Sequence, residues 1–119
     1  MSTQEIANRL VELCRQGEFE KALDELFSKD AVSIEPYATP AFEKETKGMD
    51  AIKEKGKKWN EMVEEMQSVT VSDPVVVTNS FACTLRLNVT MKERGPMDMT
   101  ELCVYQVKDG KIISEQKNQ

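Results

Sequence analysis

A long alternation of apolar and polar residues, from Phe81 to Lys92, constrains the fold more than any other feature of the chain. The residues on one face of this alternation are Phe81, Cys83, Leu85, Leu87, Val89 and Met91. A period of two is the period of a β-strand that buries one face, and it does not fit a helix. A turn at Glu93–Pro96 follows, and Met97–Lys108 repeats the pattern. The sequence therefore predicts a long antiparallel hairpin as the frame of the protein.

Two helices are predicted at the N-terminal end. Ser2–Glu5 has the spacing of a capping box, and apolar residues then recur three or four apart, so a helix is expected from about Thr3 to Gln16. Gly17 can end it, because glycine readily adopts the left-handed conformation. The stripe of the second helix consists of Phe19, Ala22, Leu23, Leu26 and Phe27.

A short strand, a loop and a third helix fill the middle of the chain. Asp30–Glu35 changes to a period of two and ends at Pro36, which has no N–H to donate. Pro36–Lys47 has no sustained period and predicts a loop. The third helix opens at Gly48, and its predicted apolar face is Ile52, Gly56, Trp59, Val63 and Met66. After it the pattern is of β type, and an Asp-Gly turn predicts a last strand at the edge of the sheet.

These elements predict one α+β domain over residues 1–119. We expect a cone-shaped barrel: a curved, mostly antiparallel sheet of one short early strand and four later strands, wrapped around three helices of the N-terminal half. A hollow of this kind, apolar with a few polar groups, is where small molecules usually bind. The expected partner is a small hydrophobic molecule.

Composition excludes several classes of function. The chain has no histidine, which excludes Ser-His-Asp and Cys-His catalytic pairs. Its net charge of −5 argues against nucleic acid as a partner. No apolar run is long enough to span a membrane, so a cytoplasmic location is expected. The isolated cysteines Cys14, Cys83 and Cys103 predict free thiols, and neither a metal site nor a cofactor is expected.

Glu101 is the first candidate catalytic residue, because it interrupts an apolar stripe. The other members of the stripe are Met97, Met99, Cys103, Tyr105 and Val107. Burial of a lone carboxylate raises its pKa, so Glu101 could hold a proton near neutral pH and act as a general acid. The alternative is a partly solvated face on which Glu101 pairs with Arg86 or Arg94.

Glu35, directly before Pro36, is the second candidate. The strand's alternation places Val32 and Ile34 on the opposite face, so Glu35 is either a solvated carboxylate or turned inward by a bend. Candidate pocket residues are Tyr37, Trp59, Met99, Cys103 and Tyr105. The two tyrosines are the only phenols of the chain, and ordinary packing is the alternative for all five residues.

Three motifs lie in order along the chain: Phe27-Ser-Lys-Asp-Ala-Val-Ser-Ile-Glu-Pro36, Gly48-x-x-Ala-Ile52 and Tyr105-x-Val-x-Asp-Gly-Lys-Ile112. With the order of elements, they resemble the SnoaL-like branch of the nuclear transport factor 2-like superfamily. The resemblance implies a cone with an apolar pocket and a homodimer paired through the outer surface of the sheet. Members include ketosteroid isomerases, polyketide cyclases and epoxide hydrolases.

The resemblance also implies roles for single positions. The family's aspartate base precedes a proline at the end of the first strand, which is the place of Glu35 in this chain. The tyrosine that donates to the oxyanion in the isomerases falls on Leu10, and a second acid falls on or near Cys103. Because an enolate needs hydrogen-bond donors, these two departures argue against steroid isomerisation.

Two functional hypotheses follow. In the first, a cofactor-free enzyme uses Glu35 to remove a proton α to a carbonyl, while protonated Glu101 or Tyr105 stabilises or reprotonates the product. In the second, the chain is a non-catalytic dimeric ligand-binding or scaffold domain, and its acids are structural.

Overall fold

The N-terminal helices form as their sequence signals predict. In the computed structural model, which describes residues 1–119, helix α1 (Thr3–Arg15) opens at a complete capping box. The Glu5 backbone N–H donates to Ser2 Oγ, and the Ser2 N–H donates to the Glu5 carboxylate. Gly17, with a φ of 74°, turns the chain into α2 (Phe19–Leu26).

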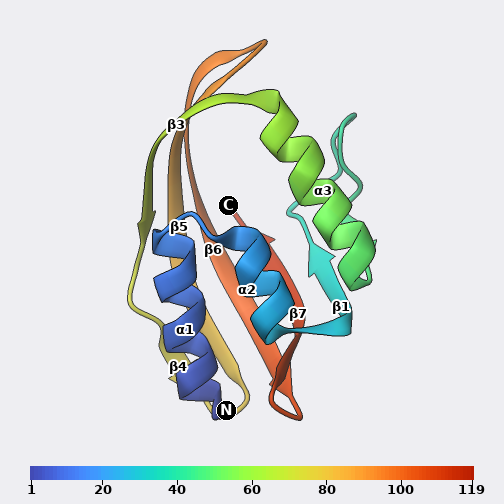
Figure 1. Ribbon diagram of the computed structural model, residues 1–119, viewed down its shortest axis with the longest axis vertical. Coiled ribbons are helices and arrows are strands. Elements are labelled where there is room, and N and C mark those ends of the chain that lie inside the picture. The colour runs from blue at the N-terminus through green and yellow to red at the C-terminus, as the bar shows by residue number, and fades with distance from the viewer.

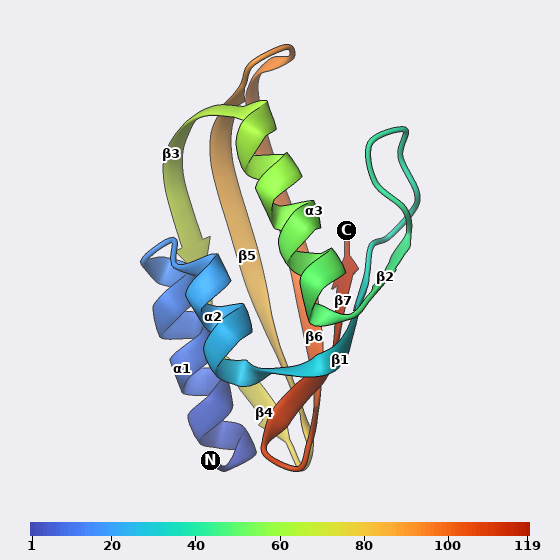
Figure 2. The same ribbon diagram turned by 45° about the vertical axis from the view of Figure 1, so that its right-hand side comes forward.

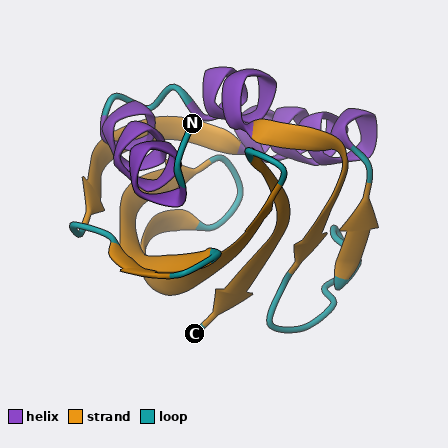
Figure 3. Ribbon diagram, turned by 90° about the horizontal axis from the view of Figure 1, so that it is seen from below, coloured by secondary structure: helices purple, strands orange, loops and turns teal.

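The remaining elements are β1 (Phe27–Ile34), β2 (Glu45–Lys47), α3 (Met49–Met62), β3 (Val63–Val71), β4 (Val75–Val77), β5 (Ser80–Met91), β6 (Gly95–Lys108) and β7 (Lys111–Asn118). One sheet contains all seven strands in the order β2-β1-β7-β6-β5-β3, and β4 also pairs with β5. Every pairing is antiparallel except that of β1 with β7, which is parallel. The sheet curls, and the three helices lie on one side of it (Figures 1 and 3). The predicted α+β fold class is confirmed.

The main core lies between α1, α2 and the inner face of the sheet. Tyr105 on β6 stacks on Phe81 of β5, with ring centroids 4.7 Å apart, and Phe27 meets Tyr105 edge-on at 6.4 Å. Ile6 and Leu10 of α1 are almost completely buried in the same cluster. The predicted free thiols are confirmed as three buried free cysteines in this core. This end of the molecule is filled by its own side chains.

A second, smaller cluster lies where α3 crosses the sheet (Figure 2). Its buried members are Leu87, Val89 and Met91 of β5. Half-buried apolar residues pack around them, among them Trp59, Met62, Met66, Met97 and Met99. The inner face of the sheet is therefore covered by the main core at one end and partly exposed beside α3 at the other.

The prediction that α3 extends through Val63 and Met66 is wrong. The helix ends at Met62, and Val63 is the first residue of β3, with an extended backbone. The strand shifts register between Val63 and Glu65 and again between Met66 and Ser68. Each bulge adds one residue, so the inward positions Val63, Met66 and Val69 recur every three residues. That spacing imitates a helical period, which explains the error.

The prediction that the last strand lies at the edge of the sheet is also wrong. Strand β7 lies between β1 and β6, with Ser33 opposite Glu115 on one side and Cys103 opposite Lys117 on the other. The polar tail is thus a central strand, because β1 adds alongside it in parallel. The sheet has seven strands instead of the predicted five. Val75–Val77 forms a strand of its own, β4, after the break at Pro74, and the three-residue strand β2 lies in the predicted loop.

None of the helices has both the length and the apolar character needed to cross a membrane. The cytoplasmic location stays a prediction.

Candidate functional site

Three adjacent strands and one helix bring six polar side chains together at the inner face of the sheet. We call this group the interior ionic cluster, and its members are Ser33, Glu35, Lys55, Glu101, Glu115 and Lys117. Strand β1 supplies Ser33, and Glu35 directly follows it; β7 supplies Glu115 and Lys117. Sheet register explains the grouping, because Ser33 pairs with Glu115 and Cys103 pairs with Lys117. Glu101 lies two residues from Cys103 on β6 and shares its face.

Glu35 turns inward because the strand geometry continues past the end of β1. Its backbone N–H donates to the Lys44 carbonyl at 2.7 Å, which extends the pairing of β1 with β2 by one residue. Glu35 therefore keeps the alternation of Ser33, which is completely buried, and its carboxylate faces the cluster. Of the two alternatives left by the sequence, the structure shows the inward one.

Two lysines hold the Glu35 carboxylate. Lys55 Nζ, on α3, lies 3.0 Å from Glu35 Oε1, and Lys117 Nζ lies 3.6 Å from the same oxygen. Lys55 also donates to Ser33 Oγ at 2.8 Å, and Ser33 Oγ lies 3.3 Å from Glu115 Oε1. The cluster thus ties α3 to β1 and β7.

The lysines set the charge of Glu35. Burial alone raises its pKa, but Lys117 and Lys55 together outweigh burial, so the pKa of Glu35 lies below its ordinary value. Glu35 is therefore ionised at neutral pH. A carboxylate with a lowered pKa is also a weak base, which limits the substrates from which it can take a proton.

The pKa of Glu101 shifts in the opposite direction, above its ordinary value. Its side chain is buried, with 5% of the residue exposed, and it has no hydrogen bond or ion pair within the protein. Burial raises its pKa, Lys117 opposes this, and the nearby charges of Glu35 and Glu115 raise it further. The predicted rise in pKa is confirmed. The alternative partner Arg86 instead donates to Asp98 through two hydrogen bonds of 3.0 and 2.7 Å.

Lys117 is one of the members that the sequence does not predict; the others are Ser33, Lys55 and Glu115. Its ammonium group lies 3.6 Å from Glu35 Oε1 and 4.0 Å from Glu115 Oε1, and 24% of its side-chain surface is accessible. Burial lowers the pKa of Lys117, but Glu115, Glu35 and Glu101 outweigh burial and raise it. The one pattern in the sequence that indicates Lys117 is that Glu115 and Lys117 occupy alternate positions after the Asp-Gly turn, as on one face of a strand. A solvated polar tail would show the same pattern.

The charges of the cluster balance in one protonation state. The five ionisable members are three glutamates and two lysines. With Glu101 neutral, the carboxylates of Glu35 and Glu115 match the ammonium groups of Lys55 and Lys117. Because a net charge in a partly desolvated site is unfavourable, this balance acts in the same direction as burial, which raises the pKa of Glu101.

The other predicted site residues lie in three different places. Cys103 and Tyr105 lie in the main core, and burial raises the pKa of Tyr105 well above its ordinary value. Trp59 and Met99 belong to the smaller, half-buried cluster next to the ionic one. Tyr37 is 59% exposed, and its hydroxyl donates to Gln119 Oε1 at 3.2 Å. The structure thus groups Glu35 with Glu101 and keeps Tyr37 on the outside.

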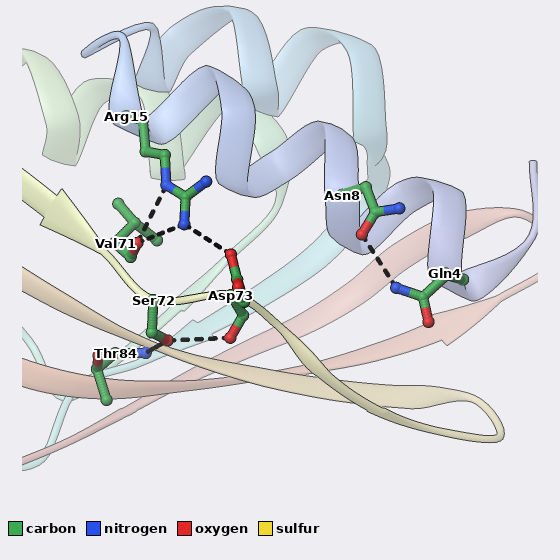
Figure 4. A network of polar contacts seen from close by, with 7 residues as sticks. All are labelled: Gln4, Asn8, Arg15, Val71, Ser72, Asp73 and Thr84. Atoms are coloured by element: carbon green, nitrogen blue, oxygen red, sulfur yellow. Dashed lines mark hydrogen bonds and ion pairs between the residues drawn. The ribbon is translucent and has the colours of Figure 1, made fainter.

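A separate polar groove lies between α1 and the connection from β3 to β4 (Figure 4). Its volume is about 420 Å³, and it is open to solvent. Arg15 donates to the Val71 carbonyl through two hydrogen bonds of 3.0 and 2.8 Å, and to Asp73 at 3.0 Å. These contacts fasten the C-terminal end of α1 to the sheet, which accounts for the groove structurally.

Known proteins share this architecture along nine-tenths or more of their length. The sequence profile of the SnoaL-like domain family matches residues 1–118. A crystal structure from Mesorhizobium loti, of a candidate SnoaL-like polyketide cyclase, has 31% sequence identity and a TM-score of 0.93, and the match covers 100% of both chains. No curated protein matches the chain in sequence.

Two more distant structures share the fold. A protein of unknown function with a cystatin-like fold from Xanthomonas campestris is 18% identical, with a TM-score of 0.83 over 99% of this chain and 90% of that one. A nuclear transport factor 2-like protein of unknown function from Burkholderia pseudomallei is 10% identical, with a TM-score of 0.79 over 99% of this chain and 91% of that one. With the family match over residues 1–118 and the 31% identity to the Mesorhizobium loti protein over its full length, the chain belongs to the SnoaL-like family.

Proposed function

We propose that the protein binds a small, largely apolar molecule with a carbonyl group at the inner face of the sheet, and that Glu35 and Glu101 catalyse proton transfer on it without a cofactor. The observation that carries the proposal is Glu101: a buried carboxylate with a raised pKa and no partner in the protein. Buried polar groups are almost always hydrogen-bonded, so the Glu101 carboxyl, whose oxygens reach solvent, takes its partner from outside the chain, as a water molecule or a ligand atom.

The position of Glu101 on β6 indicates the apolar part of the ligand. On the inner face of this strand, Met97 and Met99 are half-buried, whereas Cys103 and Tyr105 are buried. Glu101 lies at the boundary between them. A ligand bound over the half-buried methionines and Trp59 would bury apolar surface and bring its carbonyl to Glu101. Methionine suits such a surface because its unbranched side chain adapts to different shapes.

The two carboxylates divide the chemistry. Protonated Glu101 donates a hydrogen bond to the carbonyl oxygen, which acidifies the neighbouring C–H group. Ionised Glu35 takes that proton, and Glu101 stabilises the enolate or returns a proton to it. Because Glu35 is a weak base, the substrate needs an acidic C–H group, such as one between two carbonyls. A polyketide-like chain has such groups, and the candidate polyketide cyclase at 31% identity supports this class.

Proton exchange on a 1,3-dicarbonyl probe tests the proposal. The exchange of the α-hydrogens of 1-phenylbutane-1,3-dione for deuterium is followed by NMR, with and without protein. We expect the protein to accelerate exchange beyond the buffer rate, and E35Q and E101Q to bind the probe but exchange it more slowly. A carboxyl lost from general acid–base catalysis typically slows the rate about a hundredfold. Full acceleration by both variants would contradict the proposal.

A non-catalytic ligand-binding or scaffold domain is the second candidate. The observation in its favour is that Lys55 and Lys117 both form ion pairs with Glu35. An ion-pair network of this kind is also found where its role is purely structural. This candidate gives probe binding, detected through the fluorescence of Trp59, with no acceleration of exchange in the unmodified protein.

We also propose a homodimer paired through the outer face of the sheet. Leu102, on that face of β6, is 44% exposed, and its neighbour Val104 is half-buried. Apolar side chains on a sheet face favour a second copy as the cover, because the same patch then meets itself across a two-fold axis. Sedimentation should show a dimer that L102E dissociates; a monomeric unmodified protein would contradict this.

A further inference from the structure

We propose that Lys117 touches the ligand and donates a hydrogen bond to the oxygen on which negative charge develops. The inference rests on the proposed function and adds a third residue to the same site. It also defines the class of ligand that the site prefers: an apolar molecule whose oxygen becomes an enolate or a phenolate.

Lys117 has hydrogen-bonding capacity that the protein does not use. An ammonium group carries three donors. Its nearest carboxylate oxygens lie 3.6 and 4.0 Å away, beyond hydrogen-bonding distance, and it makes no shorter polar contact in the protein. By contrast, Lys55 donates to two oxygens at 2.8 and 3.0 Å. Lys55 therefore uses its N–H donors within the protein, whereas the N–H donors of Lys117 are free to bind a ligand.

The open group is also reachable. About a quarter of the Lys117 side chain is accessible, and no buried side-chain polar atom of the protein is both sealed from solvent and without a partner. The unused donors of Lys117 and the unpaired carboxyl of Glu101 therefore both face space that a water molecule or a ligand atom can occupy.

Sheet register places Lys117 and Glu101 at a distance that suits one shared oxygen atom. Lys117 is opposite Cys103, and Glu101 is two residues from Cys103 on the same face, so the two are diagonal neighbours. Diagonal positions lie about 7 Å apart. A single oxygen that accepts from both groups needs donors about 3 Å away on each side. Two flexible side chains on diagonal positions meet that requirement.

The surroundings fix Lys117 as a donor and not as a nucleophile. Burial lowers the pKa of Lys117, but neighbouring carboxylates, Glu115 first, raise it above its ordinary value, so the ammonium group stays protonated at neutral pH. A protonated amine has no lone pair with which to attack a carbonyl, which argues against a covalent role. A fixed positive charge beside the reacting oxygen instead stabilises that oxygen most when it is negative.

Ionisation of bound 2-naphthol tests the inference, since the neutral and ionised forms absorb at different wavelengths. If Lys117 donates to the oxygen, bound naphthol should ionise at a lower pH than free naphthol. K117Q should raise the pH of ionisation by the equivalent of about tenfold in the ionisation constant, the size of a charge-assisted hydrogen bond. K117R should keep most of the effect, and K108Q, which removes an exposed lysine, should keep all of it.

Each result decides between stated alternatives. Failure of the unmodified protein to bind naphthol overturns the inference, whereas the proposed function is decided separately by proton exchange on the dicarbonyl probe. Binding with equal ionisation constants in the unmodified protein and in K117Q overturns the inference alone. If K117Q does not fold, the unmodified protein still decides, because ionisation of bound naphthol at the same pH as free naphthol, or at a higher pH, contradicts a donor at Lys117.

Discussion

Cys103 on β6 and Lys117 on β7 pair directly across the sheet, and this register brings a positive charge next to Glu101, the one buried carboxylate without a partner. The charge of Lys117 acts on Glu101, where it opposes the rise in pKa that burial causes. The chemistry of the site depends on this relationship between neighbouring strands.

Replacing Glu101 should stabilise the protein at neutral pH. Because the folded-state pKa of Glu101 is raised, the folded chain binds the proton more tightly than the unfolded chain, and stability falls as pH rises from the unfolded pKa through the folded one. E101Q removes this penalty. We expect a gain in the free energy of unfolding at pH 7 that disappears as the pH falls below the ordinary glutamate pKa of about 4.3. Urea unfolding at pH 7 and in acid measures it, and E93Q, in an exposed turn, is the control. Equal stability of E101Q and the unmodified protein at pH 7 would contradict the assignment.

Replacing Glu35 should have the opposite sign. Its folded-state pKa is lowered, so its contribution to stability is present above the unfolded pKa and is lost as pH falls through the folded one. E35Q is therefore expected to lower stability at pH 7 and to match the unmodified protein in strong acid. The same urea series measures the difference. A stabilising effect of E35Q at pH 7 would show that the lysines do not hold its carboxylate.

Lys55 should be more important for stability than other lysines of α3. K55M removes the bonds to Ser33 and Glu35 and leaves a half-buried carboxylate with one distant partner. We expect a loss of roughly 2 kcal/mol, less than for a fully buried pair because part of the cluster reaches solvent. K57M, on the exposed side of the same helix, should change stability by less than about 0.5 kcal/mol. A similar small effect of both variants in thermal unfolding would argue against the network.

Tyr105 should be dispensable for proton transfer. Its ring is stacked on Phe81 in the filled core, away from the half-buried cluster. Y105F keeps the ring packing, so exchange on the dicarbonyl probe should stay within about twofold of the unmodified rate. A fall of about a hundredfold, the size expected for a lost oxyanion donor, would return Tyr105 to the catalytic group.

Local sequence patterns predict much of this fold. The alternation from Phe81 to Met91 and the capping box at Ser2 depend on neighbours in the chain, and both elements form as predicted. The end of α3 was misjudged because two bulges in β3 give inward residues a spacing of three. A bulge depends on the partner strand, which a local pattern does not show.

The candidate site could be predicted only in part. Glu101 was found because a charge within an apolar stripe is a local signal. Lys117 was missed because its meaning depends on β1 lying parallel to β7, a contact between segments more than 80 residues apart. Likewise, nothing in the local sequence joins Lys55 on a helix to Ser33 on a strand. Pairing at long range decides which charges meet.

The most direct test of the account is an NMR titration of the side-chain carboxyl carbons of Glu101 and Glu35 in the free protein. The account predicts that the pKa of Glu101 lies above, and that of Glu35 below, the ordinary glutamate value of about 4.3. If both carboxyls titrate at the ordinary value, the interior ionic cluster does not exist in solution and the proposed chemistry has no basis.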